Sequence, residues 1–243
     1  MINRKKKRYK LIGAIVVVLI FLSVPEIIHR NSGVSTANGS VRAGSLTNGY
    51  LLPYRGKNFN YFSPFSYFIL NNAYTHHAVH NTILDAYKIC ETTVPGVKFR
   101  LMETSNQDGG RLHFHRTHQN GTSADFMSPK KNRKGQQVNR YDWIGLSHYL
   151  LNFDDEGKIQ FDTGTTIDFE SMALHILALH EAAAKNGLSI RKVILRIGLK
   201  DELYATTAGA QIKAKGIYIV QNLTHIVNVL HDDHYHVDFN IAK

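Results

Sequence analysis

The chain has 243 residues, of which 43% are hydrophobic, so it is long and apolar enough to bury a sizeable core and is not a disordered protein. Its formal net charge of +10 indicates an anionic environment, such as nucleic acid, an acidic membrane surface or an anionic wall polymer. The single cysteine, Cys90, excludes an intrachain disulfide and a thiolate-rich zinc site. Any bound metal must therefore be held by His, Asp or Glu side chains.

The first 30 residues combine a basic segment with an apolar run. MINRKKKRYK carries the positive charge, and the run LIGAIVVVLIFLSV, residues 11–24, has no charged side chain. This order is typical of a signal peptide or a signal-anchor, and it predicts that the basic end stays inside while the rest of the chain is exported. No small-x-small cleavage site directly follows the run, which favours an uncleaved anchor over release after cleavage.

The remainder of the chain reads as one linker and one domain. Residues 31–43 are rich in Ser, Gly and Asn, and we expect a flexible linker there. A single folded domain is expected over residues 44–243, because no second linker of comparable length follows. Within it, residues 129–140 (PKKNRKGQQVNR) are basic and poor in apolar side chains, which indicates a surface insertion.

Hydrophobic spacing predicts two helices, over residues 75–90 and 168–187, the second with Asp168 as its N-cap and Gly187 as its stop. Strands are predicted at residues 97–103, 111–115, 124–127, 190–197, 216–220 and 234–241. Because these helices are grouped between strands that lack βα regularity, we expect an α+β fold with an antiparallel β-sheet core and flanking helices.

The last predicted strand, HYHVDFNI, has one apolar face and one polar face. Period-two alternation places His234, His236 and Asp238 together on the polar face. Two neighbouring imidazoles suit a zinc site in which one binds the metal and the other faces the metal-bound water. Taken alone, the pattern is better explained as the solvated face of an edge strand.

A second polar segment, HRTHQNGTSADF at residues 115–126, supplies further ligand types. His118 and Asp125 flank Asn120-Gly121, a turn signal that allows the chain to reverse and bring the two side chains together. With a third ligand from the distant strand, they would leave the fourth tetrahedral position for water, as in catalytic zinc sites. The combination predicts a zinc site on the sheet.

The two motifs together resemble those of a known family. H-x6-D at His118 and Asp125, followed by H-x-H at His234 and His236, resembles the zinc peptidase group of lysostaphin-type enzymes and D-Ala-D-Ala dipeptidases. The chain looks most like the penicillin-insensitive murein endopeptidases, whose H-x-x-H-Q-x-G-x-x-x-D and H-x-x-H-x-H match HRTHQNGTSADF and HDDHYH. GSLTNGYLLP, residues 44–53, is similar to the start of their mature domain. The family's usual cysteines are missing, and residues 129–140 fall outside its pattern.

The resemblance implies roles for particular residues. The implied ligands of Zn2+ are His118, Asp125 and His236. His234 and His231 would be catalytic, and His115 would either contact substrate or support the site from outside the ligand set. The activity implied is hydrolysis of the peptide cross-links of peptidoglycan (murein) by metal-activated water with histidine assistance, in the periplasm at the inner membrane.

Two other functions remain open on the same residues. One is a D,D-carboxypeptidase or dipeptidase of the same fold, and the other is a non-catalytic cell-wall-binding module. Nucleic acid is disfavoured as a partner, because the chain is exported and its lysines are not interleaved with aromatic residues.

Several further polar residues have weaker patterns. His76, His77 and His80 crowd the start of the first helix, where histidines on a helix surface explain the pattern better than a second metal site does. Asp142 and His148 follow the basic segment and are candidates for lining the cleft.

Overall fold

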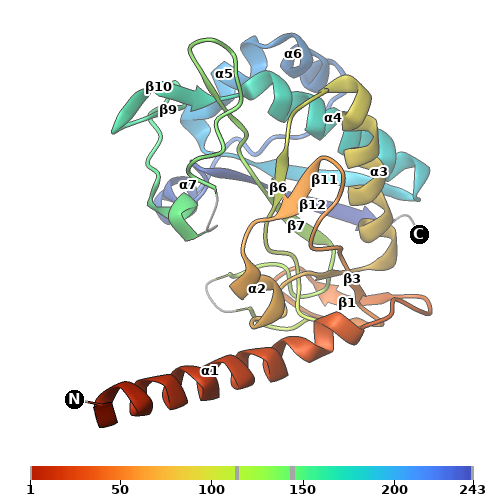
Figure 1. Ribbon diagram of the computed structural model, residues 1–243. Coiled ribbons are helices and arrows are strands. Elements are labelled where there is room, and N and C mark those ends of the chain that lie inside the picture. The colour runs from red at the N-terminus through yellow and green to blue at the C-terminus, as the bar shows by residue number, and fades with distance from the viewer. Residues whose placement is uncertain (1, 113–114, 143–145, 242–243) are drawn as a thin grey trace.

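The computed structural model describes residues 2–112, 115–142 and 146–241. Helices are combined with mostly antiparallel sheets, in agreement with the expected α+β class. The central sheet has the strand order β11-β12-β7-β6-β4, in which the β4–β6 pair is parallel and the other pairs are antiparallel (Figure 1). Its strands are Phe59–Tyr61 (β4), Phe99–Leu101 (β6), Ser123–Met127 (β7), Leu188–Ile194 (β11) and His234–Ile241 (β12).

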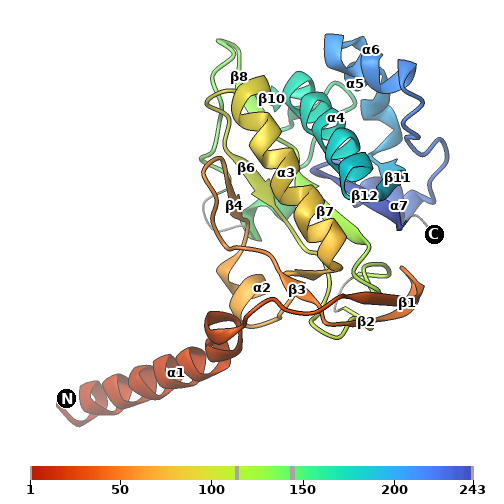
Figure 2. The same ribbon diagram turned by 90° about the vertical axis from the view of Figure 1, so that its right-hand side faces the viewer.

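Two long helices, α3 (His77–Thr93) and α4 (Phe169–Lys185), lie side by side against one face of this sheet (Figure 2). The His175 ring of α4 stacks on Tyr87 of α3 with centroids 4.9 Å apart. The same ring lies 4.9 Å from the ring of Phe126 in β7 and 6.0 Å from that of Tyr235 in β12. Because successive strand residues point to opposite faces, the neighbours of Phe126 and Tyr235 face away from the helices.

The ends of the two helices agree with their expected signals. Asp168 accepts a hydrogen bond from the backbone N–H of Ser171, which confirms it as the N-cap of α4. Gly187 follows the helix with φ +72°, the left-handed conformation that commonly stops a helix. Helix α3 continues past Cys90 to Thr93, because helical hydrogen bonding persists until the chain approaches Pro95.

Four of the six predicted strands are confirmed, and 234–241 has the bounds that alternation predicts. The predicted strand at 216–220 is wrong. That segment makes one isolated parallel bridge, between Ile219 and Val193 of β11, although Ile217 and Ile219 are buried and Tyr218 is exposed as in a strand. Of the strand predicted at 111–115, residues 113 and 114 lie outside the described part of the chain, and 111, 112 and 115 are not in strands.

Three smaller sheets surround the central one. Two of them include strands from the segments 31–43 and 129–140, which are poor in apolar residues. Within residues 31–43, strand β1 forms a hairpin with β2. Within residues 129–140, strand β8 joins a sheet of order β8-β10-β9, and the Lys130 side chain is buried against Asp142, with Nζ and Oδ1 2.9 Å apart. The strands are Thr36–Ser40 (β1), Ala43–Thr47 (β2), Tyr50–Leu51 (β3), Tyr74–Thr75 (β5), Lys130–Asn132 (β8), Lys158–Ile159 (β9) and Asp162–Ile167 (β10).

Helix α1 (Ile2–Ile28) extends away from the rest of the chain in both views, and Arg8–Ile28 within it is long and apolar enough to cross a membrane (Figures 1 and 2). Immediately after it, Asn31 makes two hydrogen bonds to Leu51: its amide Nδ2 donates to the carbonyl (3.0 Å), and its Oδ1 accepts from the Leu51 N–H (2.7 Å). The remaining short helices are Pro64–Phe68 (α2), Leu146–Leu150 (η1), Ile197–Leu199 (η2), Lys200–Ala205 (α5), Thr207–Ala214 (α6) and His225–Val229 (α7).

Candidate metal centre and active site

The centre of the candidate site is a pair of residues on adjacent strands. Asp125 of β7 and His236 of β12 are direct partners in the antiparallel register, and both side chains lie on the sheet face that α3 and α4 leave uncovered. Asp125 Oδ1 and His236 Nδ1 are 2.7 Å apart, and both residues are almost fully buried. The two widely separated sequence motifs therefore meet here.

The loop before β7 brings His118 to the same carboxylate. His118 Nε2 lies 3.1 Å from Asp125 Oδ2, and the His118 ring centroid lies 4.8 Å from that of His236. His118 has φ +71°, an uncommon conformation for a residue other than glycine, and such local strain is concentrated at functional sites. Apart from this contact with Asp125, neither ring nitrogen of His118 has a hydrogen-bond partner among the described residues, and burying an imidazole in this way is costly unless a further ligand satisfies it.

The predicted turn at Asn120-Gly121 sets the path of this loop. Asn120 Oδ1 accepts hydrogen bonds from the Thr122 N–H (3.3 Å) and hydroxyl (2.8 Å), and Gly121 has φ +73°. The Gly121 carbonyl accepts from the His76 N–H at 2.9 Å, so the turn packs closely on the start of α3. A side chain at Gly121 would meet Leu46 Cδ2 at 2.7 Å, which explains why the turn requires glycine.

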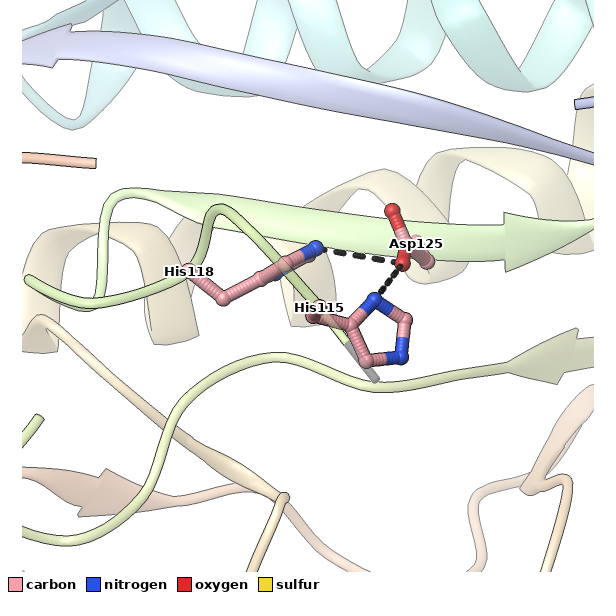
Figure 3. A group of neighbouring side chains, drawn as sticks. All are labelled: His115, His118 and Asp125. Carbon is pink, nitrogen blue, oxygen red and sulfur yellow. Dashed lines mark ion pairs between the residues drawn. The ribbon is translucent and has the colours of Figure 1, made fainter. Parts of the chain in front are cut away.

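His115 also faces Asp125 (Figure 3). Its Nδ1 lies 3.7 Å from Asp125 Oδ2, so that both imidazoles of the H-x-x-H pair approach one carboxylate oxygen. The ligand atoms of His115, His118 and Asp125 all lie within 4.8 Å of one another, and this group could hold a metal ion. On its other side, His115 Nε2 lies 4.0 Å from Glu103 Oε2.

His231 and His234 complete the group of predicted residues. Their ring centroids are 4.8 Å apart, and the His231 ring lies 6.3 Å from that of His236. His231 Nδ1 donates to the Val227 carbonyl of α7 at 2.6 Å. His234 Nδ1 lies 2.5 Å from Asp233 Oδ1. The structure thus brings all six residues that the two motifs predict into one site.

The site divides into charged and neutral imidazoles. Burial acts to lower the pKa of His234 and of His236, but Asp233 next to His234, and Asp125 with Asp238 next to His236, raise each pKa to about 9. Burial lowers the pKa of His115 to about 4.

His231 and Asp125 also have shifted pKa values. Burial lowers the pKa of His231 to about 3. Burial acts to raise the pKa of the Asp125 carboxyl, yet the adjacent His118 and His236 hold it well below its usual range. Near neutral pH, the site therefore holds an ionised carboxylate together with both protonated and neutral imidazoles.

Three carboxylates behind these imidazoles were not among the predicted site residues: Asp238, Asp233 and Glu103. Asp238 Oδ1 lies 2.7 Å from His236 Nε2 and also accepts a hydrogen bond from the Ser123 hydroxyl at 2.6 Å. Period-two alternation already places Asp238 on the face of His236, and that signal could have identified it. Glu103 follows β6 and has no comparable signal, since its partners come from separate segments.

The other histidine cluster has local structural roles. His76 caps α3 by accepting from the Ala78 N–H, and His77 Nδ1 accepts from the Ser35 N–H at 3.0 Å. His80 contacts the ring of Tyr50. These contacts account for the histidines at the start of α3 without a metal.

The donor set around Asp125 could hold a metal ion. Ligand atoms about 2.0 Å from a tetrahedral zinc ion lie about 3.3 Å from one another. The separations of His118 Nε2 and His115 Nδ1 from the same atom, Asp125 Oδ2, are 3.1 and 3.7 Å and lie close to that value, whereas His236 Nδ1 lies 2.7 Å from the other oxygen, Oδ1. Imidazole and carboxylate ligands of this kind suit zinc, and the buried His118 ring, whose one polar contact among the described residues is with Asp125, is the group that most needs a further ligand.

Comparison with known proteins adds no family to these observations. No protein-family model matches the chain, and no curated protein matches it. Its functional interpretation therefore comes from motif spacing and from the geometry of the site.

Proposed function

We propose that this chain is a zinc-dependent endopeptidase that hydrolyses the peptide cross-links of peptidoglycan. The observation that carries the proposal is the meeting of Asp125 and His236 across β7 and β12, with His118 3.1 Å from the same carboxylate. This is the arrangement expected from the resemblance of the two histidine motifs to those of murein endopeptidases. His231 and His234 lie beside it, as a hydrolytic site requires.

The proposed zinc ligands are His118, Asp125 and His236. His236 is preferred to His115 as the third ligand because the resemblance implies it and because Asp238 lies behind it, with His236 Nε2 2.7 Å from Asp238 Oδ1. A carboxylate behind a ligating imidazole fixes its orientation and increases its basicity. Bound zinc would lower the pKa of a water molecule to about 7 and polarise the scissile carbonyl.

The histidines beside the ligands would handle the proton. Burial acts to lower the pKa of His234, but Asp233 engages its Nδ1 and raises that pKa to about 9, so His234 would act as an imidazolium whose Nε2–H steers a proton and stabilises the oxyanion. His231 has its Nδ1 engaged by the Val227 carbonyl and likewise presents Nε2. His115 would contact the substrate or support Asp125.

Helix α1 supports a location at the membrane. Its basic N-terminal residues would remain in the cytoplasm while the domain lies on the periplasmic side, anchored to the inner membrane or released after cleavage. Peptidoglycan is an anionic polymer in that compartment, and the net charge of +10 would favour contact with it.

The test combines metal analysis with digestion of cross-linked muropeptides by the purified full-length protein. About one zinc per chain and release of monomers are expected, and both should be lost in His118→Ala and His236→Ala. The control is His180→Ala, which removes a histidine of α4 outside the site. A wild type that binds no metal would overturn the proposal. Removal of only a terminal D-alanine would instead show a carboxypeptidase, and wall binding without turnover would show a binding module.

A further inference from the structure

The short helix η1 places two consecutive side chains against two different acidic residues of the candidate site. His148 Nε2 donates to the backbone carbonyl of Asp233 at 2.6 Å and lies 3.6 Å from its carboxylate. The hydroxyl of Tyr149, the next residue, donates to Glu103 Oε2 at 2.9 Å. Asp233 and Glu103 are carboxylates that stand behind two different histidines of the site.

We propose that η1 positions the imidazoles of this site from behind: His148 fixes Asp233, which orients His234, and Tyr149 fixes Glu103, which faces His115. Only the expected fall in kcat rests on the proposed function; the positioning of the two histidines does not. Neither His148 nor Tyr149 is assigned a contact with substrate, so both are positioning residues. They are additional to the proposed metal ligands and to the histidines described above.

The His148 side of this arrangement is fully buried. His148 has no exposed surface, and its only hydrogen bond among the described residues is the one to Asp233, because its Nδ1 has no partner. The Ser128 N–H donates to the same carbonyl at 3.0 Å, so the Asp233 backbone is held from two segments. A fixed backbone places Asp233 Oδ1 2.5 Å from His234 Nδ1, and this bond determines which ring nitrogen of His234 is left free.

The Tyr149 side reaches a buried carboxylate. Glu103 is only 6% exposed, and its two oxygens accept from the Ser66 hydroxyl (3.1 Å) and the Tyr149 hydroxyl (2.9 Å). Its Oε2, the atom bound by Tyr149, is also the atom 4.0 Å from His115 Nε2. The Tyr149 hydroxyl therefore sets the position of the oxygen that faces His115.

The downstream end of η1 is anchored firmly enough to hold both contacts. Leu151 and Phe153 are buried in the core. The Phe153 N–H donates to Asp232 Oδ2 at 3.2 Å, and its carbonyl accepts from Arg196 Nη1 at 2.7 Å. The segment is thus fixed next to the residue that precedes Asp233.

The test uses full-length protein in detergent with 15N-labelled histidine, and the variants Tyr149→Phe, His148→Gln and His148→Ala. The signals of His234 and His115 are assigned with His234→Gln and His115→Gln. We expect His148→Ala to remove the downfield Nδ1–H signal of His234 and leave His115 unchanged. His148→Gln, whose amide N–H can replace the Nε2 donor, should restore the His234 signal. Tyr149→Phe should shift only the His115 nitrogens.

Muropeptide hydrolysis is measured on the same variants. By analogy with other supporting residues, kcat should fall about 10- to 100-fold in Tyr149→Phe and His148→Ala with KM little changed. The control is Tyr50→Phe, which removes a hydroxyl that donates to the Gly33 carbonyl outside the site.

The positioning role is overturned if Tyr149→Phe leaves His115 unchanged, or if each variant disturbs both histidines alike. Tyr149→Phe and His148→Gln keep the test decisive if His148→Ala does not fold. Because the NMR signals do not depend on turnover, failure of the wild type to hydrolyse muropeptides would overturn the proposed function alone.

Discussion

Asp125 and His236 are separated by 110 residues of chain and yet face each other across β7 and β12, with their side-chain atoms 2.7 Å apart. Strand register, and not a local loop, therefore sets the distance between two proposed ligands. A shift of the register by one residue would turn His236 toward α3 and α4, because alternate residues of a strand point to opposite faces.

Asp125→Asn tests this pair in the metal-free protein. The His236 imidazole, whose pKa Asp125 and Asp238 raise to about 9 against the effect of burial, would lose the larger of these two buried partners. We expect the free energy of unfolding in urea at pH 7 to fall by about 3 kcal/mol. Asp85→Asn, which breaks the exposed pair with Lys185, should cost less than about 1 kcal/mol. Equal costs would contradict the buried pairing.

Asp238→Asn tests the carboxylate behind His236. The variant keeps the shape of the side chain but removes the charge that the Nε2 of His236 faces at 2.7 Å. Zinc affinity, measured by competition with a chelator, should fall about 10- to 100-fold. Asp201→Asn, on the exposed surface of α5, is the control. Unchanged affinity in Asp238→Asn would show that His236 does not depend on this partner, or is not a ligand.

Gly121→Ala tests the turn that carries His118 toward Asp125. The added Cβ would lie 2.7 Å from Leu46 Cδ2 and 2.8 Å from the His76 nitrogen, at φ +73°. We expect a loss of about 2 kcal/mol or more in thermal or urea unfolding, together with weaker metal binding. Gly110→Ala is matched in backbone conformation, at φ +78°, but has open space around its Cβ. It should show the smaller cost of conformation alone, about 1 kcal/mol.

His175→Phe tests the pH dependence of the core. Burial lowers the pKa of His175 from 6.5 to about 3, so below pH 6.5 the unfolded state takes up a proton that the folded state does not. Because of His175, the free energy of unfolding therefore decreases as the pH falls from about 6.5 to about 3, by up to about 1.4 kcal/mol per pH unit.

The phenyl ring of this variant would keep the stacking on Tyr87, but Tyr235 would lose its 2.6 Å partner at His175 Nδ1. The variant should thus be less stable at pH 7 and yet lose less stability between pH 6 and pH 4. Parallel pH profiles of the two proteins in urea would contradict a neutral, buried His175.

Val18→Arg tests whether α1 spans a membrane. Position 18 is near the middle of the apolar segment Arg8–Ile28, where an arginine costs about 3 kcal/mol of insertion free energy. The wild type should remain with membranes after carbonate washing, and the variant should not. Phe65→Arg, at an exposed position on α2, should behave as the wild type. A wild type recovered in shortened, soluble form would instead show that the segment is a cleaved signal.

Periodic patterns predicted the fold well where one face of an element is buried. Strand β12 has the bounds of its alternating pattern because Tyr235 and Val237 pack on the helices while His234 and His236 face the site. Residues 216–220 show the same alternation, but they lie at the border of the sheet and meet β11 at one bridge only. Alternation reports which side chains are buried and does not report whether a neighbouring strand is present to pair with.

The motifs predicted which residues come together, but not what holds them. His118, Asp125 and His236 could be selected because ligand types at a recognisable spacing are visible in the sequence. Glu103 and Tyr149 could not, because their contact depends on the approach of β6 and η1, which no period or spacing encodes. Composition was also insufficient for residues 36–40, which are mostly polar and contain glycine but pair with β2 in an antiparallel hairpin.

The hydrogen bonds between Asn31 and Leu51 limit how far the domain can move from α1. Only His29 and Arg30 separate Ile28, the last residue of the helix, from this attachment, and three extended backbone steps span about 10 Å. With α1 fixed in a bilayer, the distance between the site and the membrane surface would be limited by the dimensions of the domain itself. Under the proposed function, hydrolysis would therefore be confined to the layer of the wall nearest the membrane that holds α1.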